Sequence, residues 1–442
     1  MTFEPCSTRQ RIAIVGSGAS GLGAAFHLQR SGYDVELIER EENLGGRFGV
    51  GMLGDRPVMM GGKNIGRRYT AFRGFTASFG RQPWEPFGIN TSRVQGDEVL
   101  TLDSTRRGRS SRYLLRAGTP RDLARLASLA AGVRRNEQNR FLGSPFAASL
   151  ARRHDHAPLA AHFDPKLTRN LLRPMTIRTN GAEPDECYLG TFNTNIGLLM
   201  DTYDQLSFGI QPVLDAFASR VTVTLGTRVE RLVVSDGQVT GLRLTRNGSA
   251  AEERSFDAVV LATPAHATAQ VLQDDLPGLS ERLDAVRYFP STVVLVEYDR
   301  PVFTPEVRAL AMDDGPCSNA GSYGATDRHI VRYTFSGREA RAVKPSEAQI
   351  EAWVDQAEER LNRYVPFKGA RRLRSVGRHW DAAYCAYVPF HGEFFAEVQD
   401  TVAGVGGLEL AGDYLRGVSI EGCFRSGTDA GVRTAKFLGT AS

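Results

Sequence analysis

Three glycines and one carboxylate near the start of the chain have the types and the spacing needed to hold a dinucleotide. Gly16, Gly18 and Gly21 form a GxGxxG pattern, and Glu39 comes eighteen residues after Gly21. Glycine at these positions allows a tight turn, a close backbone approach to a pyrophosphate, and tight packing of a helix on a strand. A carboxylate at Glu39 accepts hydrogen bonds from a ribose 2′-hydroxyl and repels a 2′-phosphate. This set favours FAD or NAD over NADP.

The segments around these residues are those of a strand, helix and strand unit. Residues 12–15 form a continuous apolar run, which is typical of a buried parallel strand. A helix of small and apolar residues follows until Ser31 and Gly32 end it, and residues 34–39 form a second strand. All of these parts fall within about 30 residues, the span of one βαβ unit. We therefore predict that a pyrophosphate lies at the N-terminus of the helix.

The stretch that follows Glu39 favours FAD over NAD. It ends in Leu44-Gly45-Gly46-Arg47. This sequence resembles the second glycine doublet of the glutathione-reductase-like flavoproteins, in which a further turn packs against the FAD. The resemblance implies an α/β fold with a Rossmann-like FAD-binding domain of the glutathione-reductase type.

Length and composition indicate a globular protein of two domains. The chain has 442 residues, too many for one hydrophobic core, and its 41% hydrophobic and 24% charged residues are ordinary for globular proteins. The formal net charge is only +4, and no basic helix or RNA-binding signature accompanies it. We therefore expect no nucleic-acid partner.

The cysteines are scattered singly along the chain. Cys6, Cys187, Cys317, Cys385 and Cys423 have neither the paired spacing of a zinc site nor the density of a secreted scaffold. This pattern favours a reducing, cytoplasmic setting and predicts no metal site. Because no signal-like N-terminus and no long apolar run occur, we expect neither export nor a transmembrane segment. Peripheral membrane contact and the oligomeric state stay open.

Two later blocks of sequence share the β-rich character of the N-terminal unit. The first has a hairpin that turns at Asp236 and Gly237, followed by an apolar strand that ends in Ala262-Thr263-Pro264. The second has a strand near residues 408–410 and a helix over about residues 426–438. We predict that the three blocks form one discontinuous FAD-binding domain, and that a helix-rich first insertion and a second insertion form an α+β substrate domain. The predicted FAD-binding domain comprises residues 1–101, 215–287 and 394–442, and the predicted substrate domain residues 102–214 and 288–393.

Four segments together resemble the flavin amine oxidase superfamily, which includes the monoamine and polyamine oxidases, protoporphyrinogen oxidase and the phytoene-type desaturases. They are the glycine turn with Glu39 and Gly45-Gly46-Arg47; residues 60–66, similar to a Gly-Gly-x-x-x-Gly loop beside the flavin ring; Val229 with residues 262–264, similar to the adenine-side hairpin and strand; and Gly412-Asp413 with Glu421-Gly422, similar to the C-terminal motif.

The resemblance implies FAD as the cofactor. It also implies that a helix N-terminus in the C-terminal motif stabilises the negative charge of reduced flavin. The predicted cofactor-binding residues are Gly16, Gly18, Ser20, Gly21, Glu39, Arg40, Gly46, Arg47, Gly61, Gly62, Val229, Thr263, Gly412, Asp413 and Ile420.

Three positions depart from the amine-oxidase pattern. Amine oxidases place a lysine on the first strand of the second insertion, where it holds a water against flavin N5, and Val293 stands at that position here. Monoamine oxidases cage the substrate nitrogen between two tyrosines, one of which matches Tyr384 while the other falls on Ser419. Covalent flavin attachment uses a cysteine just before the first tyrosine, where this chain has Ala383. We therefore expect non-covalent FAD.

Lys63 and Tyr384 are the candidate catalytic residues. If the Gly61-Gly62 loop matches the family, Lys63 lies near the isoalloxazine ring, where a cation raises the flavin's reduction potential or binds a substrate carboxylate. The alternative is a surface lysine on a loop. For Tyr384 the alternatives are contact with the substrate across the flavin face and plain core packing.

These observations predict an FAD-dependent oxidoreductase that dehydrogenates an organic substrate by hydride transfer to flavin N5. Oxygen or another electron acceptor then reoxidises the flavin. The departures favour carbon-carbon or ring desaturation, as in protoporphyrinogen oxidase and the desaturases, with a tailoring role in specialised metabolism. The alternatives are an amine or amino-acid oxidase and a redox-neutral FAD-dependent isomerase. The Rab GDP-dissociation inhibitors share this fold without flavin, but that interpretation requires a degraded glycine turn.

Overall fold

A five-stranded parallel sheet forms the centre of one half of the molecule, which the computed structural model describes for residues 9–95, 98–246 and 248–441. In spatial order its strands are β10 (Thr222–Thr224), β2 (Asp34–Ile38), β1 (Arg11–Val15), β14 (Ala258–Leu261) and β20 (Leu408–Leu410). Val15 lies opposite Ile38 on one side and Leu261 on the other. The three predicted blocks of sequence therefore meet in one sheet. Cys6 lies outside the described residues.

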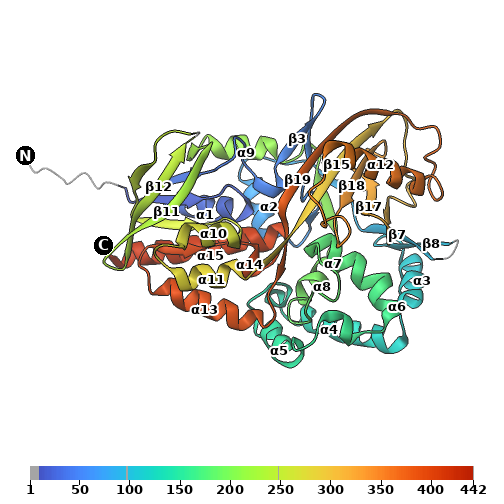
Figure 1. The fold of residues 1–442 in the computed structure, drawn as a ribbon, viewed down its shortest axis with the longest axis horizontal. Coiled ribbons are helices and arrows are strands. Elements are labelled where there is room, and N and C mark those ends of the chain that lie inside the picture. Colours follow the sequence, from blue (N-terminus) through green and yellow to red (C-terminus); the bar gives the residue numbers. More distant parts are fainter. Residues whose placement is uncertain (1–8, 96–97, 247, 442) are drawn as a thin grey trace, which may run out of the picture.

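Both faces of this sheet are covered, as its apolar strands require. Ile12 and Ile14 face a layer formed by helices α1 (Ala19–Arg30) and α15 (Ile420–Ala441). The alternate residues Ala13 and Val15 face an antiparallel sheet of β11 (Thr227–Ser235), β12 (Gln238–Arg246) and β13 (Glu252–Ser255). Figure 1 shows α1 and α15 side by side, although they lie near opposite ends of the chain.

A seven-stranded mixed sheet lies in the other half of the molecule (Figure 1). Its strands are, in spatial order, β19 (Arg372–Tyr387), β15 (Arg287–Tyr298), β18 (Ile330–Phe335), β17 (Cys317–Ser322), β16 (Ala309–Ala311), β7 (Asn90–Gln95) and β8 (Glu98–Asp103). Helix α12 (Glu347–Leu361) packs on this sheet through Trp353 and Val354.

Two of the predicted domain edges fall inside secondary-structure elements. The boundary predicted at residue 101 lies inside β8, and β7 pairs in parallel with β16, so these strands belong with the seven-stranded sheet. The boundary predicted at residue 215 lies inside α9 (Gln211–Ala218), whose Phe217 packs in the core beneath the five-stranded sheet. The division into an FAD-binding and a substrate domain otherwise stays a prediction.

The first insertion is rich in helices, in agreement with the sequence. Its main helices are α3 (Arg107–Ala117), α4 (Pro120–Arg135), α5 (Pro145–His154), α6 (Pro165–Leu167), α7 (Arg173–Asn180) and α8 (Asn193–Leu199). A π-helical turn, Thr168–Leu172, separates α6 from α7. Such turns insert a residue into a helix and change where the following side chains point.

The remaining strands and α-helices lie around these two sheets. They are β3 (Val50–Leu53), β4 (Arg56–Met59), β5 (Ile65–Gly66), α2 (Thr70–Ala77), β6 (Trp84–Pro86), β9 (Tyr203–Leu206), α10 (Ala265–Leu272), α11 (Pro277–Asp284), α13 (His391–Ala403) and α14 (Asp413–Arg416). Within the described part of the chain, no helix has the length and apolar character needed to cross a membrane.

Candidate active site

The glycine turn has the geometry that its spacing predicts. Gly16 has a φ of +96°, which favours glycine. At Gly21 a Cβ would lie only 1.8 Å from the carbonyl oxygen of Gly16, so any side chain would push α1 away from β1. Next to Gly18, by contrast, a Cβ would meet nothing within 4 Å. This open space at the N-terminus of α1 fits a pyrophosphate, because backbone N–H groups are available there.

Glu39 ties the glycine turn to the end of β2. Its side chain is buried, and its carboxylate accepts hydrogen bonds from the backbone N–H of Ser17 at 2.8 Å, the hydroxyl of Ser17 at 2.6 Å and the N–H of Glu41 at 2.9 Å. A carboxylate has about four acceptor positions, so one is left for a ribose hydroxyl. Glu39, the residue predicted to bind the ribose, therefore also has a structural role.

Asp413 joins the first block of the site to the last. Its carboxylate is buried, lies 2.7 Å from Nη1 of Arg47 and accepts a hydrogen bond from the hydroxyl of Tyr288 at 2.6 Å. Burial alone would lower the pKa of Arg47, but the charge and hydrogen bond of Asp413 together with nearby Tyr288 and Cys423 outweigh it, and the pKa is raised. Burial, and next the same carboxylate, raise the pKa of Tyr288. Three distant segments thus form one charge-balanced cluster.

The Gly61-Gly62 loop fits closely between this cluster and α15. A Cβ at Gly61 would lie 1.6 Å from the carbonyl oxygen of Arg47, and a Cβ at Gly62 would lie 3.2 Å from Cδ1 of Ile420. On its other side the loop is held by Arg332, which donates a hydrogen bond from Nη1 to the Gly61 carbonyl oxygen at 2.7 Å. Gly61 is therefore needed for packing, whereas a side chain at Gly62 would require Ile420 to shift by a few tenths of an ångström.

A large cavity extends from the glycine turn into the space beside the two insertions. Nine predicted cofactor-binding residues line it: Gly18, Ser20, Arg47, Gly61, Gly62, Thr263, Gly412, Asp413 and Ile420. Both candidate catalytic residues, Lys63 and Tyr384, line it as well. Outside its lining are Gly16, Gly21, Glu39, Arg40, Gly46 and Val229. Among these, Arg40 has a side chain that is 70% exposed, and nothing in the structure directs it toward the cavity.

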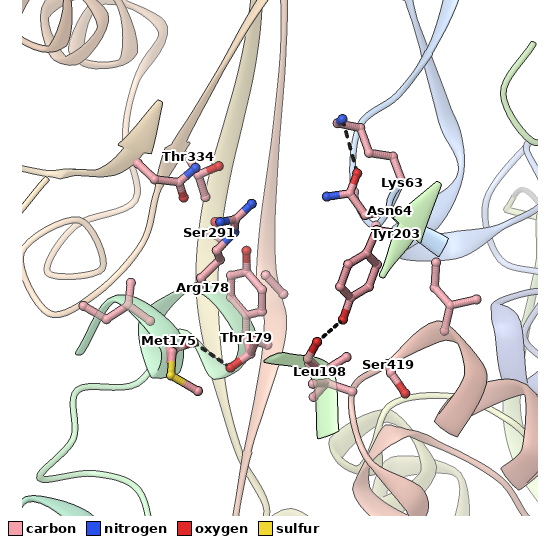
Figure 2. A pocket seen from close by; sticks show the side chains of 18 of the residues that line it. Lys63, Asn64, Met175, Arg178, Thr179, Leu198, Tyr203, Ser291, Thr334 and Ser419 are labelled. Atoms are coloured by element: carbon pink, nitrogen blue, oxygen red, sulfur yellow. Dashed lines mark hydrogen bonds between the residues drawn. The ribbon is translucent and has the colours of Figure 1, made fainter. Parts of the chain in front are cut away.

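Lys63 lies in the cavity wall, so the surface-loop alternative is wrong. Its side chain is buried, and Nζ donates a hydrogen bond to the carbonyl oxygen of Tyr323 and lies 4.3 Å from the centre of the Phe87 ring. Burial, and next the positive charges of Arg332 and Arg178, lower the pKa of Lys63. Figure 2 shows Lys63 beside Asn64 on one wall of the cavity.

The three positions that depart from the amine-oxidase pattern all reach this space. Val293, Ala383 and Ser419 line the cavity from β15, β19 and the residue before α15, and so does Tyr384, the position that matches the pattern. Gly181 makes room for the tyrosine, since a Cβ there would lie 2.9 Å from Cδ2 of Tyr384. The hydroxyl of Ser419 accepts a hydrogen bond from the N–H of Gly422 at 2.9 Å, in the first turn of α15. The residues that the resemblance aligns with the amine-oxidase site therefore lie around one cavity.

Two arginines in the wall were missed by the sequence argument. Arg178 projects from α7 and Arg332 from β18. A signal existed for Arg332, because it is the charged residue within the otherwise apolar and hydroxyl-bearing strand Ile330–Phe335. Arg178 has no comparable signal in an arginine-rich insertion.

The cysteines near the cavity favour non-covalent flavin. Cys423 lines the cavity, whereas Cys385 is fully buried and is not part of the lining. Burial raises the pKa of Cys423 to about 12, and it raises the pKa of Cys385 as well. A protonated thiol is a poor nucleophile, so neither sulfur is activated for attachment.

Comparison with known proteins identifies the family. The chain matches the family of flavin-containing amine oxidoreductases over residues 19–433. One relative is AofH of Mycobacterium tuberculosis (strain ATCC 25618 / H37Rv), described as a flavin-containing monoamine oxidase. It is 26% identical to this chain over 290 residues. The match covers 62% of this chain and 61% of AofH, so the chain spans less than two thirds of that protein.

Solved structures show the same fold at low identity. A putrescine oxidase variant with a redesigned cofactor site superposes with a TM-score of 0.74 and 17% identity, over 98% of this chain and 99% of that chain. A protein from Exiguobacterium sp. described as a protoporphyrinogen oxidase superposes with a TM-score of 0.71 and 16% identity, over 98% of this chain and 99% of that chain. With the FAD cradle and the family match in agreement, this chain belongs to the flavin-containing amine oxidoreductases and uses FAD as its cofactor.

Proposed function

We propose that this enzyme dehydrogenates an organic substrate by hydride transfer from a substrate carbon to flavin N5, and that it forms a carbon-carbon or ring double bond. The bound FAD supplies the electron sink. The protein then has to bind the substrate, orient its C–H bond and exclude water. The continuity of the cavity from Gly18 to Tyr384 supports this division of labour.

The side chains of Val293 and Ser419 are the main reason to propose carbon-carbon or ring desaturation rather than amine oxidation. Both line the cavity, and neither can do what its counterpart in an amine oxidase does. A valine cannot hold a water by hydrogen bonding, and a serine does not offer an aromatic face to a substrate nitrogen. The chain therefore has the fold of an amine oxidase, but its cavity wall lacks the lysine and the second tyrosine with which an amine oxidase handles its substrate.

Lys63 supplies the other half of the proposed chemistry. Formation of a double bond removes a hydride from one atom and a proton from its neighbour. Burial and the charges of two arginines lower the pKa of Lys63, so its amine loses a proton more readily than an ordinary lysine does, and we assign it as the base that accepts the substrate proton. Tyr384 contributes a ring and a hydroxyl from the facing strand, which position the substrate.

An amine or amino-acid oxidase is the second candidate, because Tyr384 retains half of the aromatic cage. A redox-neutral isomerase is the third, since the same hydride abstraction followed by its return leaves the substrate rearranged but not oxidised.

Anaerobic bleaching of the flavin tests these candidates together. Porphyrinogens, polyenes, amines and amino acids are mixed one at a time with the oxidised enzyme, and the flavin absorbance is followed. We expect a porphyrinogen or polyene to bleach it and simple amines to leave it oxidised. Bleaching by simple amines alone would overturn the proposal, and a rearranged product without net bleaching would identify an isomerase.

Residue variants connect the reaction to the cavity. We expect Lys63→Met to slow bleaching while FAD stays bound, and Tyr384→Phe to have a smaller effect because the ring is kept. Exposed Arg116, which pairs with Glu98 on the surface, offers Arg116→Gln as a matched control. Unchanged bleaching in Lys63→Met would remove the lysine from the mechanism.

We also propose a reducing, cytoplasmic setting with oxygen or another small electron acceptor. The support is that the four cysteines in the described residues are free and three of them are buried.

A further inference from the structure

The cavity wall carries more positive charge than its carboxylate can neutralise. Among the side chains that line it in the described residues are four arginines (Arg47, Arg173, Arg178 and Arg332), which are cationic, and one anionic carboxylate, Asp413. Asp413 is paired with Arg47, and Arg173 is paired with Glu183 at 2.8 Å. Within the described ranges, Arg178 and Arg332 have no ion pair.

Arg178 is held so that its guanidinium reaches the cavity. It lies in the last turn of α7, where Thr179 donates a hydrogen bond to the Met175 carbonyl oxygen at 2.8 Å and Asn180 donates one to the Cys385 carbonyl oxygen at 3.0 Å. The second bond fixes α7 to β19 next to Tyr384. Figure 2 shows Arg178 on the same wall as Ser291 and Thr334, without a hydrogen bond to the side chains drawn.

The guanidinium is charged despite its surroundings. Burial lowers the pKa of Arg178, and the groups that act against this lowering are Tyr384 and Tyr203 rather than a carboxylate. Arginine nevertheless stays protonated in proteins. Arg178 is exposed where it lines the cavity, so its guanidinium is available to an anion that enters there.

Arg332 adds charge to the same region. Burial, and the nearby charge of Arg178, lower its pKa, which shows that the two guanidinium groups act on each other. One of its nitrogens donates to the Gly61 carbonyl oxygen, and this single bond leaves other N–H groups unused.

The cofactor's own phosphates are a poor match for Arg178. The open space for a pyrophosphate lies at Gly18, where α1 begins. Arg178 comes from the first insertion, and Figure 2 places it on the wall opposite Ser419, which precedes α15. The anion that it faces is therefore brought by something other than the pyrophosphate.

We propose that the substrate carries a carboxylate and that Arg178 binds it, with Arg332 adding positive charge to the same part of the cavity. This inference rests on the proposed function, because it assumes that the cavity is the place of oxidation. A planar carboxylate matches the two parallel N–H donors of a guanidinium. The same charges disfavour a small cationic amine that has no acid group.

Benzoate and benzamide are suitable probes, because they have nearly the same shape and differ in charge. Each is titrated into the purified FAD-loaded enzyme, and binding is followed by the change in the flavin's visible spectrum. We expect benzoate to bind at least about tenfold more tightly than benzamide, the difference that a hydrogen-bonded ion pair supplies. Arg178→Gln should remove this preference for benzoate. Arg178→Lys should restore only part of it, because lysine keeps the positive charge but lacks the two parallel N–H donors of a guanidinium.

The controls separate the possible roles of the arginine. Arg116→Gln, which removes an exposed arginine, should bind benzoate as the wild type does. The FAD content of Arg178→Gln should equal that of the wild type. Equal affinity of the wild-type enzyme for the two probes, no response to benzoate, or loss of FAD from Arg178→Gln would each overturn the proposal.

The two proposals fail in different ways. If benzoate binds through Arg178 and no compound bleaches the flavin, the carboxylate site stands and the proposed oxidation is wrong. A second result would reject the carboxylate site alone. In that case a neutral compound bleaches the flavin equally well in the wild type and in Arg178→Gln, and the wild type binds benzoate no more tightly than benzamide. The proposed oxidation would then stand.

Discussion

Replacing Glu39 by glutamine tests whether this carboxylate holds the glycine turn before any cofactor binds. The carboxylate accepts two hydrogen bonds from Ser17 and one from Glu41. An amide keeps one acceptor oxygen and turns an NH₂ group toward a remaining donor. A lost bond that leaves a buried donor unsatisfied costs about 1–3 kcal/mol, and loss of the charge weakens each of the others by about 1 kcal/mol. We therefore expect the free energy of unfolding to fall by about 3–5 kcal/mol.

The measurement is thermal unfolding of the flavin-free protein, followed by circular dichroism. Ser17→Ala removes one of the three hydrogen bonds and keeps the charge, so its effect should be smaller, about 1 kcal/mol. Glu281→Gln, at an exposed position on α11, should change nothing. If the flavin-free Glu39→Gln variant unfolds at the wild-type temperature and only its FAD content falls, the structural role derived from these hydrogen bonds is refuted.

Three further predictions concern the glycine turn, the flavin and pH. Gly21→Ala should prevent FAD binding because its Cβ would overlap the Gly16 carbonyl oxygen. Gly18→Ala should fold and lose affinity for FAD. The ratio of flavin to protein absorbance after purification separates the two outcomes, since it should be zero for Gly21→Ala and reduced for Gly18→Ala. Heat or acid precipitation should release the flavin into the supernatant, and a yellow pellet would contradict non-covalent binding. Burial lowers the pKa of His391 to about 4 from 6.5, although its ring is hydrogen bonded to the Tyr414 carbonyl oxygen. Between these pH values the unfolded chain binds a proton that the folded chain does not, so stability falls as the pH falls, by up to about 3 kcal/mol. His391→Gln keeps a donor for Tyr414 and should flatten this slope in thermal unfolding across the same pH window; a variant with the wild-type slope would contradict the assignment.

Local chemistry made the turns and strands around the candidate cofactor site predictable from the sequence. The glycine turn, the strand that precedes Glu39 and the hairpin at Asp236 and Gly237 each depend on short-range preferences of the backbone, and φ at the two hairpin residues is positive, as such a turn requires. The C-terminal helix was placed too late, since it begins at Ile420 rather than near residue 426. Gly422 disfavours a helix by itself, but a Cβ there would lie 2.9 Å from the Gly417 carbonyl oxygen, so close packing requires glycine.

The substrate side was less predictable because it depends on contacts between distant segments. The pairing of β7 with β16 places Ser92 opposite Leu310, and no short-range pattern in either segment identifies the other as its partner. Arg178 illustrates the same limit. Its sequence neighbourhood is that of an ordinary helix, and only the packing of α7 on β19 directs it into the cavity.

The pairing of α1 with α15 constrains when the protein can mature. The hydroxyl of Tyr33, just after α1, donates a hydrogen bond to the carbonyl oxygen of Ala435, 402 residues later. During synthesis the first two strands of the sheet and α1 therefore leave the ribosome long before the helix that covers them, and the pairing of such distant segments is slow. Until then their apolar face has to be protected, and Arg47 has no Asp413 to pair with. Cofactor loading is thus a late event that follows translation of almost the whole chain.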